Sequence, residues 1–533
     1  MGAGVAGLYC AWRLLEQQPT RRVVVVERLP RTGGRLESDL IKIHSQVIHE
    51  EEGGMRFNGG MPELIKVLRA MDLCGDITPF PMVDPSQNNR RYLRGRSFTV
   101  AEAERDRNQI WGQLYALNAD ERGRDPLDVL GAAFTRVLTA NGADPTSTPR
   151  TPEFWQRLRT RFHWKDVPLN RWPLWGLLGD LGVSEECITL LGQIAGFEAP
   201  FRAPANAGAA FQILEDFSGQ PQFYTMKRGF SRLPDALAAR VQALAGHIML
   251  GAEAKVLARA DEFTLGVETS AGSRVQLTAP QVILALPAGP LQQLLQASPS
   301  LTGGAHGRQL GVDAASVCGL QMLKLVFYYD HAWWGEQSVN RSPFLVGPSF
   351  TDLPVNTVYP FLAVTGDAVT GPAALTVYCD FAKVNYWRGL QGVGPRFASP
   401  FQREHADGPH ALTAASQATV AAAGEQFARA FDARQIPAPV LTSYRCWSDD
   451  DPFGAAYHLW SLGVDDAAVT QRMVEPLTGL FVANEAWSDM QGWVNGALRS
   501  ADLVLARFGI TPLAADAARP TCDLPLQPPK SAR

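Results

Sequence analysis

The chain has 533 residues, a formal net charge of −4, 46% hydrophobic and 19% charged residues. This length predicts two to four structural units of roughly 150 residues each, and the mildly acidic balance excludes a general electrostatic attraction to nucleic acid or anionic membranes. No stretch reaches the ~18–20 unbroken apolar residues of a membrane span, and no signal peptide is visible. The seven cysteines stand singly, without a C-x-x-C pair. They argue against a disulfide framework or a zinc site and favour a reducing compartment such as the cytoplasm.

The first motif is a glycine turn, "MGAGVAG", in which Gly2, Gly4 and Gly7 match G-x-G-x-x-G. Spacing predicts a helix from residue 8 to 18 and then a buried parallel strand in "RRVVVVERL", which ends near Glu27. In dinucleotide-binding proteins the phosphates lie on the N-terminus of such a helix, and the acid accepts the ribose hydroxyls. The alternative is a structural turn beside a surface acid.

Two further glycine pairs follow, in "RTGGRLES" and "HEEEGGMRF". Glycine lets the backbone approach a ligand closely, and an arginine such as Arg35 can pair with a pyrophosphate. Arg35 could instead be a solvated surface charge. In the second segment, Arg56 could form an ion pair with Glu51 or Glu52.

The remaining elements are predicted in chain order. Helical spacing over residues 101–200 predicts a mostly helical insertion. "QFYTMKRGFSRLPDALAARVQAL" predicts a strand, a glycine and a helix, and residues 252–287 predict short antiparallel strands. "LQMLKLVFYY" and "AALTVYCDFA" predict two more strands, and residues 479–509 a strand, a loop and a helix. The Pro/Ala-rich tail predicts disorder.

Taken together, these motifs resemble the flavin-dependent amine oxidases. They occur in that family's order: E-R-x-x-x-x-G-G-R, E-x-G-G-M-R-F, "MKRGFSRLPDAL", "VILALP", "LKLVFYYDHAWWG" and "FVANEAWSDMQGWVNGAL". The resemblance runs from Gly2 to about Gly509. It implies an α/β fold: a doubly wound FAD-binding domain, whose first strand is missing before Met1, a sheet-based substrate domain and a helical insertion.

The resemblance also implies domain boundaries. The FAD-binding domain would take residues 1–60, 218–296 and 470–511, and the substrate-binding domain residues 61–110, 206–217 and 305–469. The helical insertion would take residues 111–205, and residues 512–533 would form a disordered tail.

Cofactor-binding positions follow from the same motifs. The resemblance implies that these are Gly2, Gly4, Gly7, Glu27, Arg28, Gly34, Arg35, Gly54, Met55, Arg56, Val256, Glu485, Trp493 and Val494. Ala456 stands where the amine-specific branch carries a cysteine bonded to the flavin, so the resemblance implies non-covalent FAD.

The substrate positions indicate a branch of the family. Met55-Arg56, in place of the alanine-tyrosine of simple amine oxidases, is similar to the L-amino acid oxidases and amino acid 2-monooxygenases, whose arginine holds the substrate carboxylate. Tyr359 would assist Arg56, Tyr457 and Trp493 would flank the substrate, and Lys324 would be the catalytic lysine that binds a water at the flavin. The alternatives are core packing for the three aromatic residues and a solvent-facing Lys324.

The expected activity is FAD-dependent oxidation of an L-amino acid by dioxygen, giving a 2-oxo acid, ammonia and hydrogen peroxide. Three alternatives stay open: an amino acid 2-monooxygenase, an amine or polyamine oxidase, and a flavin-free remnant that lacks its first strand. We expect the true start to lie upstream of Met1, which leaves secretion open. We expect no nucleic-acid or membrane partner; the preferred side chain and the oligomeric state, homo-oligomer included, stay undecided.

Overall fold

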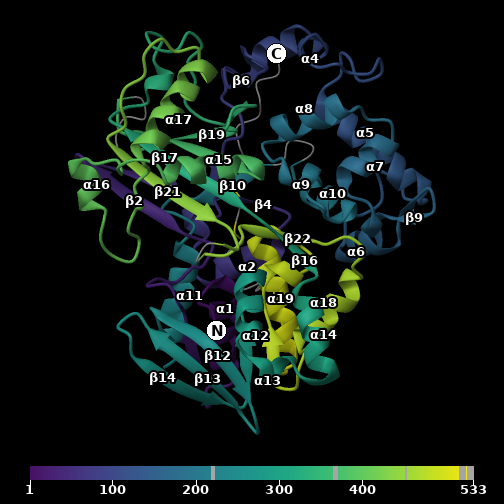
Figure 1. The fold of residues 1–533 in the computed structure, drawn as a ribbon, viewed down its shortest axis with the longest axis vertical. Coiled ribbons are helices and arrows are strands. Elements are labelled where there is room, and N and C mark those ends of the chain that lie inside the picture. Colours follow the sequence, from purple (N-terminus) through teal and green to yellow (C-terminus); the bar gives the residue numbers. More distant parts are fainter. Residues whose placement is uncertain (218–221, 364–369, 451–452, 515–521, 523, 525–533) are drawn as a thin grey trace.

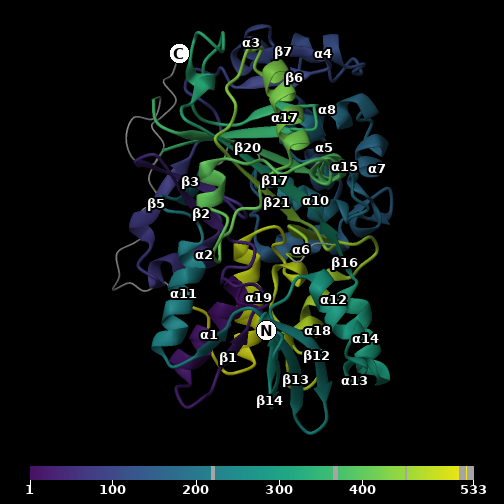
Figure 2. The ribbon, with the colours of Figure 1, turned by 60° about the vertical axis from the view of Figure 1, so that its left-hand side comes forward.

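The structure is a computed structural model that describes residues 1–217, 222–363, 370–450, 453–514, 522 and 524. Figure 1 shows three regions: helices and strands around the N-terminus in the lower half, a large sheet at the upper left and a group of helices at the upper right. Figure 2 shows the same vertical separation from a second side.

The lower region contains two pairs of parallel strands. β1 (Val24–Val26) pairs with β11 (His247–Met249), and β15 (Val282–Leu284) pairs with β23 (Leu480–Val482). The first two residues of the chain join these pairs, because Gly2 N donates to Val26 O at 2.8 Å and Ala285 N donates to Met1 O at 2.8 Å. The predicted strand before Glu27 is confirmed but short, and Val24 is 45% exposed rather than buried on both faces.

Helices cover these strands. α1 (Val5–Gln17) packs between α11 (Arg232–Ala243) and α19 (Val494–Ala506), which confirms the helix expected after the glycine turn. Beside them lies an antiparallel sheet of β12 (Ala252–Arg259), β13 (Phe263–Thr269) and β14 (Arg274–Ala279), as predicted. The same prediction is wrong for β15, which pairs in parallel with β23. The other helices of this half are α12 (Ala288–Gln296), α13 (Pro299–Thr302), α14 (Gly304–Ala314) and α18 (Asp466–Val474).

The large sheet has seven strands in the order β21-β17-β20-β19-β18-β6-β7. Their bounds are β6 (Arg90–Leu93), β7 (Arg96–Thr99), β17 (Met322–Tyr329), β18 (Ser349–Thr351), β19 (Thr357–Leu362), β20 (Ala373–Asp380) and β21 (Leu441–Trp447). Every residue of β17 is buried. One face packs on α15 (Ala382–Gln391) and α17 (Gln417–Ala430), and the other packs on the hairpin β2 (Ser38–Ile43)–β3 (Gln46–Glu51).

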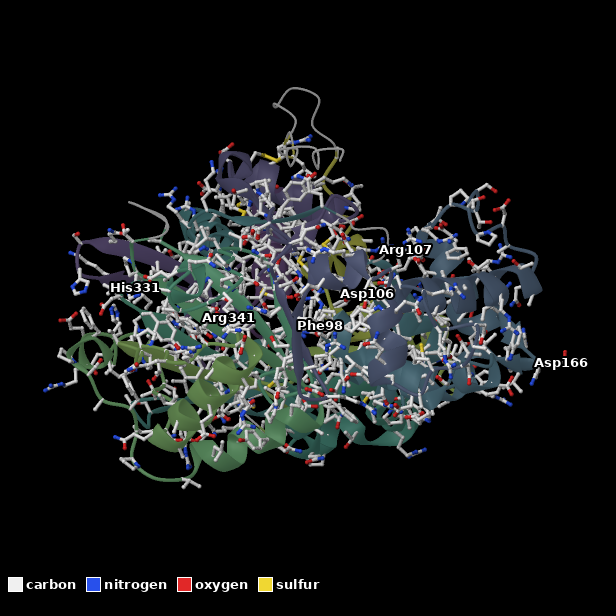
Figure 3. The ribbon with its side chains drawn as sticks, turned by 90° about the horizontal axis from the view of Figure 1, so that it is seen from above. Phe98, Asp106, Arg107, Asp166, His331 and Arg341 are labelled. Carbon is white, nitrogen blue, oxygen red and sulfur yellow. A yellow bond between two sulfur atoms is a disulfide. The ribbon has the colours of Figure 1, made fainter. Side chains whose placement is uncertain are left out.

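The helical insertion predicted for residues 101–200 is confirmed. It contains α3 (Val100–Arg105), α4 (Gln109–Leu114), α5 (Pro126–Ala140), α6 (Pro152–Arg161), α7 (Leu174–Asp180), α8 (Glu185–Ala195) and α9 (Ala199–Arg202), followed by α10 (Ala207–Glu215). These helices share a core of their own. A short hairpin with two residues in each strand, β8 (His163–Trp164)–β9 (Val167–Pro168), lies between helices α6 and α7. Figure 3 shows Asp166 in its turn at one edge of the molecule and His331 near the opposite edge.

Short elements connect the regions. β10 (Phe223–Met226) lies between β4 (Phe57–Asn58) and β5 (Ile77–Phe80), and β16 (Val317–Leu320) pairs with β22 (Tyr457–Trp460). α2 (Pro62–Ala70) packs on α19, and α16 (Pro400–Glu404) packs beside β21.

One expectation about the cysteines is wrong. Cys74 and Cys522 form a disulfide across 448 residues of sequence, with their Cα atoms 5.1 Å apart. The sequence hides this pair because only the fold brings the two residues together. A disulfide is typical of oxidising compartments, so it runs against the expectation of a reducing one. Apart from residues 512–514, 522 and 524, the tail expected to be disordered lies outside the described residues. In the described part of the chain, no helix has both the length and the apolar character needed to cross a bilayer.

Candidate cofactor and substrate cavities

Two adjoining cavities lie where the regions meet: the first within the lower region, and the second between that region, the group of helices and the large sheet. The first, of about 380 Å³, is lined by the glycine turns, the end of β1, the start of β12 and the start of α19. The second, of about 140 Å³, is lined from α2, α10, β17, β22 and α19. Residues common to both linings are Arg35, Gly54, Ala456, Gly492, Trp493 and Val494. A ligand could therefore extend from the first cavity into the second.

The glycine turns form the floor of the first cavity. Gly2 has φ +93°, and an added Cβ would lie 2.5 Å from Ala285 O. A Cβ on Gly34 would lie 3.2 Å from Gly4 Cα, so the two turns are in contact. Gly4 is the N-cap of α1 and has no side chain to bond the first N–H groups, which leaves them for an anion.

Gly7 does a different job from the one expected. It does not belong to the cavity lining in the described chain. A Cβ on Gly7 would lie only 2.0 Å from Gly2 O. Its missing side chain thus permits the close approach of helix α1 to the turn, which is the packing role of the third glycine in this motif.

Glu27 and Arg28 both line the first cavity at the end of β1. The Glu27 carboxylate accepts hydrogen bonds from Ala3 N at 2.7 Å and Leu29 N at 2.8 Å. These bonds hold the carboxylate beside the first glycine turn, and each oxygen keeps a second lone pair for a ligand hydroxyl.

Arg35 and Glu485, predicted separately, are brought together by the fold. Arg35 Nη1 donates to Glu485 Oε2 at 2.7 Å, and Arg35 Nη2 donates to Asn484 Oδ1 at 3.3 Å. Arg35 is therefore no solvated surface charge. Burial alone would raise the pKa of Glu485, but Arg35 and His458 outweigh burial and hold that pKa below its ordinary value.

His458 is a residue that sequence reasoning missed. It is fully buried in β22, its Nδ1 lies 3.0 Å from Glu485 Oε2, and its backbone N–H donates to Glu485 Oε1 at 3.1 Å. Nothing in its spacing to other histidines signals this position.

The position expected at Val256 needs a correction. Val256 is 38% exposed and is absent from the described lining, which instead runs over residues 252–255. The physical reason is a β-bulge between Ala254 and Val256, which shifts the register of β12 against β13 and turns Val256 outward. Met55 and Arg56, also expected at the cofactor, line the second cavity.

Arg56 lies at the wall of the second cavity and is 6% exposed. Its Nη1 donates to Tyr359 Oη at 2.7 Å, which joins two of the predicted residues. The guanidinium also lies 5.1–5.6 Å from four ring centroids, those of Phe80, Phe217, Phe223 and Tyr359. Among the described residues no carboxylate forms an ion pair with it, so the alternative of a pair with Glu51 or Glu52 is wrong.

Lys324 also lines the second cavity and is only 2% exposed, which excludes the solvent-facing alternative. Its Nζ donates to Gly53 O at 2.7 Å and to Glu51 O. Burial lowers the pKa of Lys324, and the neighbouring carboxyls oppose this effect. A neutral lysine has two N–H groups. Because two carbonyls accept from Nζ here, the neutral form would keep a lone pair free.

Tyr457 and Trp493 complete the second cavity. The Tyr457 hydroxyl is buried and has no hydrogen-bond partner among the described residues, so a ligand atom could satisfy it. Trp493 stacks on Phe217 with ring centroids 5.7 Å apart, and its Nε1 donates to Asp216 Oδ2 at 2.6 Å. Asp216 and the rings around Arg56 were not predicted, because no local sequence pattern marks them.

The two cavities fit a dinucleotide with a ring system at one end. The first cavity is lined by glycines that leave no room for a Cβ, by a helix N-terminus without a side-chain cap and by the Glu27 carboxylate. The unpartnered Tyr457 hydroxyl and the buried Arg56 occupy the second, where a small anionic molecule could bind.

Comparisons with known proteins agree with this geometry. A family profile described as flavin-containing amine oxidoreductase matches residues 5–391 and 406–504. The protein R188 of Acanthamoeba polyphaga mimivirus, described as uncharacterised, is 22% identical over 538 residues, which cover 96% of this chain and 93% of that protein. Aplysianin-A of Aplysia kurodai is 23% identical over 542 residues, covering 95% and 89%.

Solved structures share the fold. Putrescine oxidase with bound putrescine superposes with a TM-score of 0.61 at 17% identity, covering 95% of this chain and 97% of that one. Cyclohexylamine oxidase from Brevibacterium oxydans gives a TM-score of 0.60 at 15% identity, with the same coverage.

Proposed function

Because the chain belongs to the flavin-containing amine oxidoreductases and its cofactor is FAD, we propose that it oxidises L-amino acids to imino acids. The observation that carries this proposal is the buried Arg56, which has a tyrosine partner and no carboxylate partner among the described residues. A buried cation without a counter-ion is costly, and a carboxylate presents the two acceptors that a guanidinium fork matches.

The surroundings of Arg56 favour a substrate carboxylate over a free phosphate or a structural ion. Four aromatic rings lie around the buried guanidinium, so an anion that binds here gains from a low local dielectric. The remaining wall of the cavity is largely apolar, with Phe197, Ile213 and Leu214 among its residues. An amino acid would place its carboxylate on Arg56 and its side chain on this apolar wall.

The protein's part in the reaction is binding and orientation. Arg56 and Tyr359 would hold the carboxylate, and Tyr457 and Trp493 would confine the amine on either side. Lys324 has a free lone pair when it is neutral, so it would accept a proton at Nζ and hold it there. Alignment of the reacting atoms of this kind contributes several kcal/mol, up to ~7–11 in model reactions.

FAD would be held without a covalent bond by the glycine turns, Glu27, Arg28 and the start of α19. It supplies the acceptor for the two electrons and the hydrogen that leave Cα. Ala456 lies in both cavity linings, at the position where a cysteine would be needed for attachment.

The experiment that tests this function measures oxygen consumption with pairs of compounds that differ only in the carboxylate. L-leucine is compared with 3-methylbutylamine, and L-phenylalanine with 2-phenylethylamine. We expect turnover with the amino acid of at least one pair and little with its amine. Turnover with the amines alone would replace the proposal by an amine oxidase.

Product analysis separates the remaining alternative. An oxidase gives a 2-oxo acid, ammonia and hydrogen peroxide. A decarboxylating monooxygenase gives an amide and carbon dioxide, and that result would change the reaction class while keeping the role proposed for Arg56.

A further inference from the structure

A group of buried acids lies directly behind Lys324. Glu37, Asp39, Glu50, Glu51 and Glu52 are each at most 3% exposed. The buried cations among them are Arg31, Arg445 and Lys324. Even with His49 counted as a fourth cation, the carboxyls outnumber the positive charges. Isolated charges are costly to bury, so this surplus of carboxyls favours a proton on at least one of them in the folded protein.

The hydrogen bonds divide the five acids into two kinds. Glu37 is fully paired, with Arg31 at 2.7 Å and Arg445 at 2.6 Å, and Glu51 accepts from His49, Ser38 and Phe230 N. Asp39, Glu50 and Glu52 differ, because each has one buried carboxyl oxygen without a hydrogen-bond partner among the described residues. In the same part of the chain, the buried Tyr328 hydroxyl and Arg445 Nε also have no such partner. Unpaired donors and acceptors side by side are a place for shared protons or an internal water.

The backbone explains why these acids form a row. Asp39 and Glu50 are directly opposite each other in the β2–β3 hairpin, so their side chains lie on the same face. Glu50 Oε1 accepts from Thr376 Oγ1 at 3.0 Å, and Glu52 accepts from Ser443 Oγ. These hydroxyls belong to β20 and β21, the neighbours of β17. The hairpin therefore packs these acids against the part of the sheet that carries Lys324.

Lys324 and Asp39, at the two ends of this row of side chains, line different cavities. Lys324 lines the substrate cavity. Asp39 lines a separate surface groove, whose other ionisable lining residues are Arg228, Arg232, Asp235, Glu404, His405, Asp407 and His410. Asp39 interacts electrostatically with Glu50 and Glu52, and these two interact with Lys324, so the acids lie between the substrate cavity and the groove.

We propose that Asp39, Glu50 and Glu52 are a proton store and relay that serves Lys324 during amino acid oxidation. The inference rests on the proposed function. When an amino acid zwitterion becomes its imino acid with a protonated imine nitrogen, Cα loses a hydride, which carries both electrons to the cofactor, and the ammonium loses one proton. Oxygen becomes hydrogen peroxide by taking those two electrons, the hydrogen of the hydride and one more proton. One proton thus leaves the substrate and is needed again in every turnover.

The charges around Glu50 suit this exchange. They come from β2 and the residue before it (Asp39, Glu37), from β3 and the residue after it (Glu51, Glu52), from β17 (Lys324, Tyr328) and from β21 (Arg445). Burial raises the pKa of Glu50 to about 8 and also raises the pKa values of Asp39 and Glu52, while burial lowers that of Lys324. Acids and a base whose pKa values approach one another exchange protons at little cost.

The first test needs no substrate. Infrared spectra of the FAD-loaded protein at pH 7 should contain the carbonyl stretch of a protonated carboxyl, which ionised carboxylates lack. Glu50→Gln, which has the same shape and can still accept from Thr376, should remove that signal or part of it. Glu262→Gln, an exposed change in the β12–β13 turn, should leave it unchanged. Full ionisation at pH 7, or a signal that survives both Glu50→Gln and Asp39→Asn, would overturn the store.

The second test addresses the route. After transfer to D₂O, the carboxyl signal should shift several-fold more slowly in Asp39→Asn than in the wild type and Glu262→Gln, because the groove end is blocked. Equal rates would show that protons enter elsewhere and would overturn the relay.

The third test links the store to turnover. A pH-indicator dye at pH 9, above the pKa of about 8 at which Glu50 loses its proton, should detect fewer protons per reduced cofactor in the wild type than in Glu50→Gln when L-leucine is added without oxygen. Equal release would contradict the role in turnover. Failure of any amino acid to reduce the cofactor would overturn the proposed function, while the two substrate-free tests would still decide whether the store exists.

Discussion

At the scale of single residues, Arg56 distinguishes an amino acid oxidase from an amine oxidase. Replacement by alanine removes a buried, charge-assisted pair with the substrate carboxylate, an interaction worth ~3–4 kcal/mol. We expect kcat/KM for L-leucine to fall by about 10²–10³, with no comparable loss for 3-methylbutylamine. Steady-state oxygen consumption with both compounds measures this difference.

The matched control for Arg56→Ala is Tyr359→Phe, which keeps the ring against the guanidinium but removes the hydroxyl acceptor. A single hydrogen bond is worth about 1 kcal/mol, so a loss of roughly fivefold is expected. Equal kinetics of wild type and Arg56→Ala would show that the carboxylate binds elsewhere.

Glu50 makes a second prediction at this scale, about stability. Its pKa is raised by burial to about 8 in the folded chain, against about 4.3 in an unfolded one. Between these values the folded state holds a proton that the unfolded state has lost. The free energy of unfolding should therefore fall as pH rises through this window, by up to about 1.4 kcal/mol per pH unit for one proton.

Denaturant unfolding between pH 5 and pH 8 measures that slope. Glu50→Gln should flatten it, and the exposed change Glu262→Gln should not. A slope that is identical in Glu50→Gln and wild type would mean that Glu50 is ionised in the folded protein.

At the scale of elements, the contact between α1 and the first glycine turn controls the cofactor cavity. A Cβ at position 7 would lie 2.0 Å from the carbonyl oxygen of Gly2. Gly7→Ala should therefore push the helix from the turn, destabilise the fold by ~1–3 kcal/mol and release FAD. Thermal unfolding and the flavin absorbance retained after gel filtration measure both effects.

Gly311→Ala is the control for Gly7→Ala. Gly311 also lies within a helix, α14, but an added Cβ there has open space. Because alanine is the better helix former, this change should stabilise the protein by ~0.5–1 kcal/mol. Normal FAD retention in Gly7→Ala would contradict the packing role assigned to Gly7.

The same scale shows what sequence patterns can and cannot predict. The glycine turn, α1 and the β12–β14 sheet were predictable because their signals are local: φ-demanding glycines, helical spacing and alternation. The displacement of Val256 was not, because a bulge is set by strand pairing. "HEEEGG" has the composition of a solvated surface turn, yet the hairpin lays Glu50 and Glu52 against the large sheet, where they are buried.

At the scale of the whole molecule, the substrate cavity is assembled from distant segments. Its wall combines Leu64 of α2, Leu214 of α10 and Lys324 of β17, and the hydrogen bond between Arg56 and Tyr359 spans 303 residues. The family resemblance predicted both residues of that pair, which a local sequence pattern alone could not have done. His458 and Asp216 carried no signal at all, because their partners come from other segments. The domain boundaries and the roles of the individual site residues stay predictions.

The disulfide makes a prediction at this scale. The disulfide ties Cys522 to Cys74, which follows α2, and the chain has seven cysteines in all. Thiol titration of the denatured protein should therefore give two more reactive groups after reduction than before it. Seven before reduction would show that this disulfide is absent in the purified protein.

The central claim is that a carboxylate on Arg56 presents Cα of an amino acid to the bound flavin. The most direct measurement is the anaerobic absorbance spectrum of the FAD-loaded protein before and after addition of L-leucine, and separately of 3-methylbutylamine, in wild type and Arg56→Ala. We predict bleaching of the flavin by L-leucine in the wild type, much slower bleaching in Arg56→Ala and little response to the amine in either. The account would be contradicted if the amine bleached the wild type while neither L-leucine nor any other common L-amino acid did so.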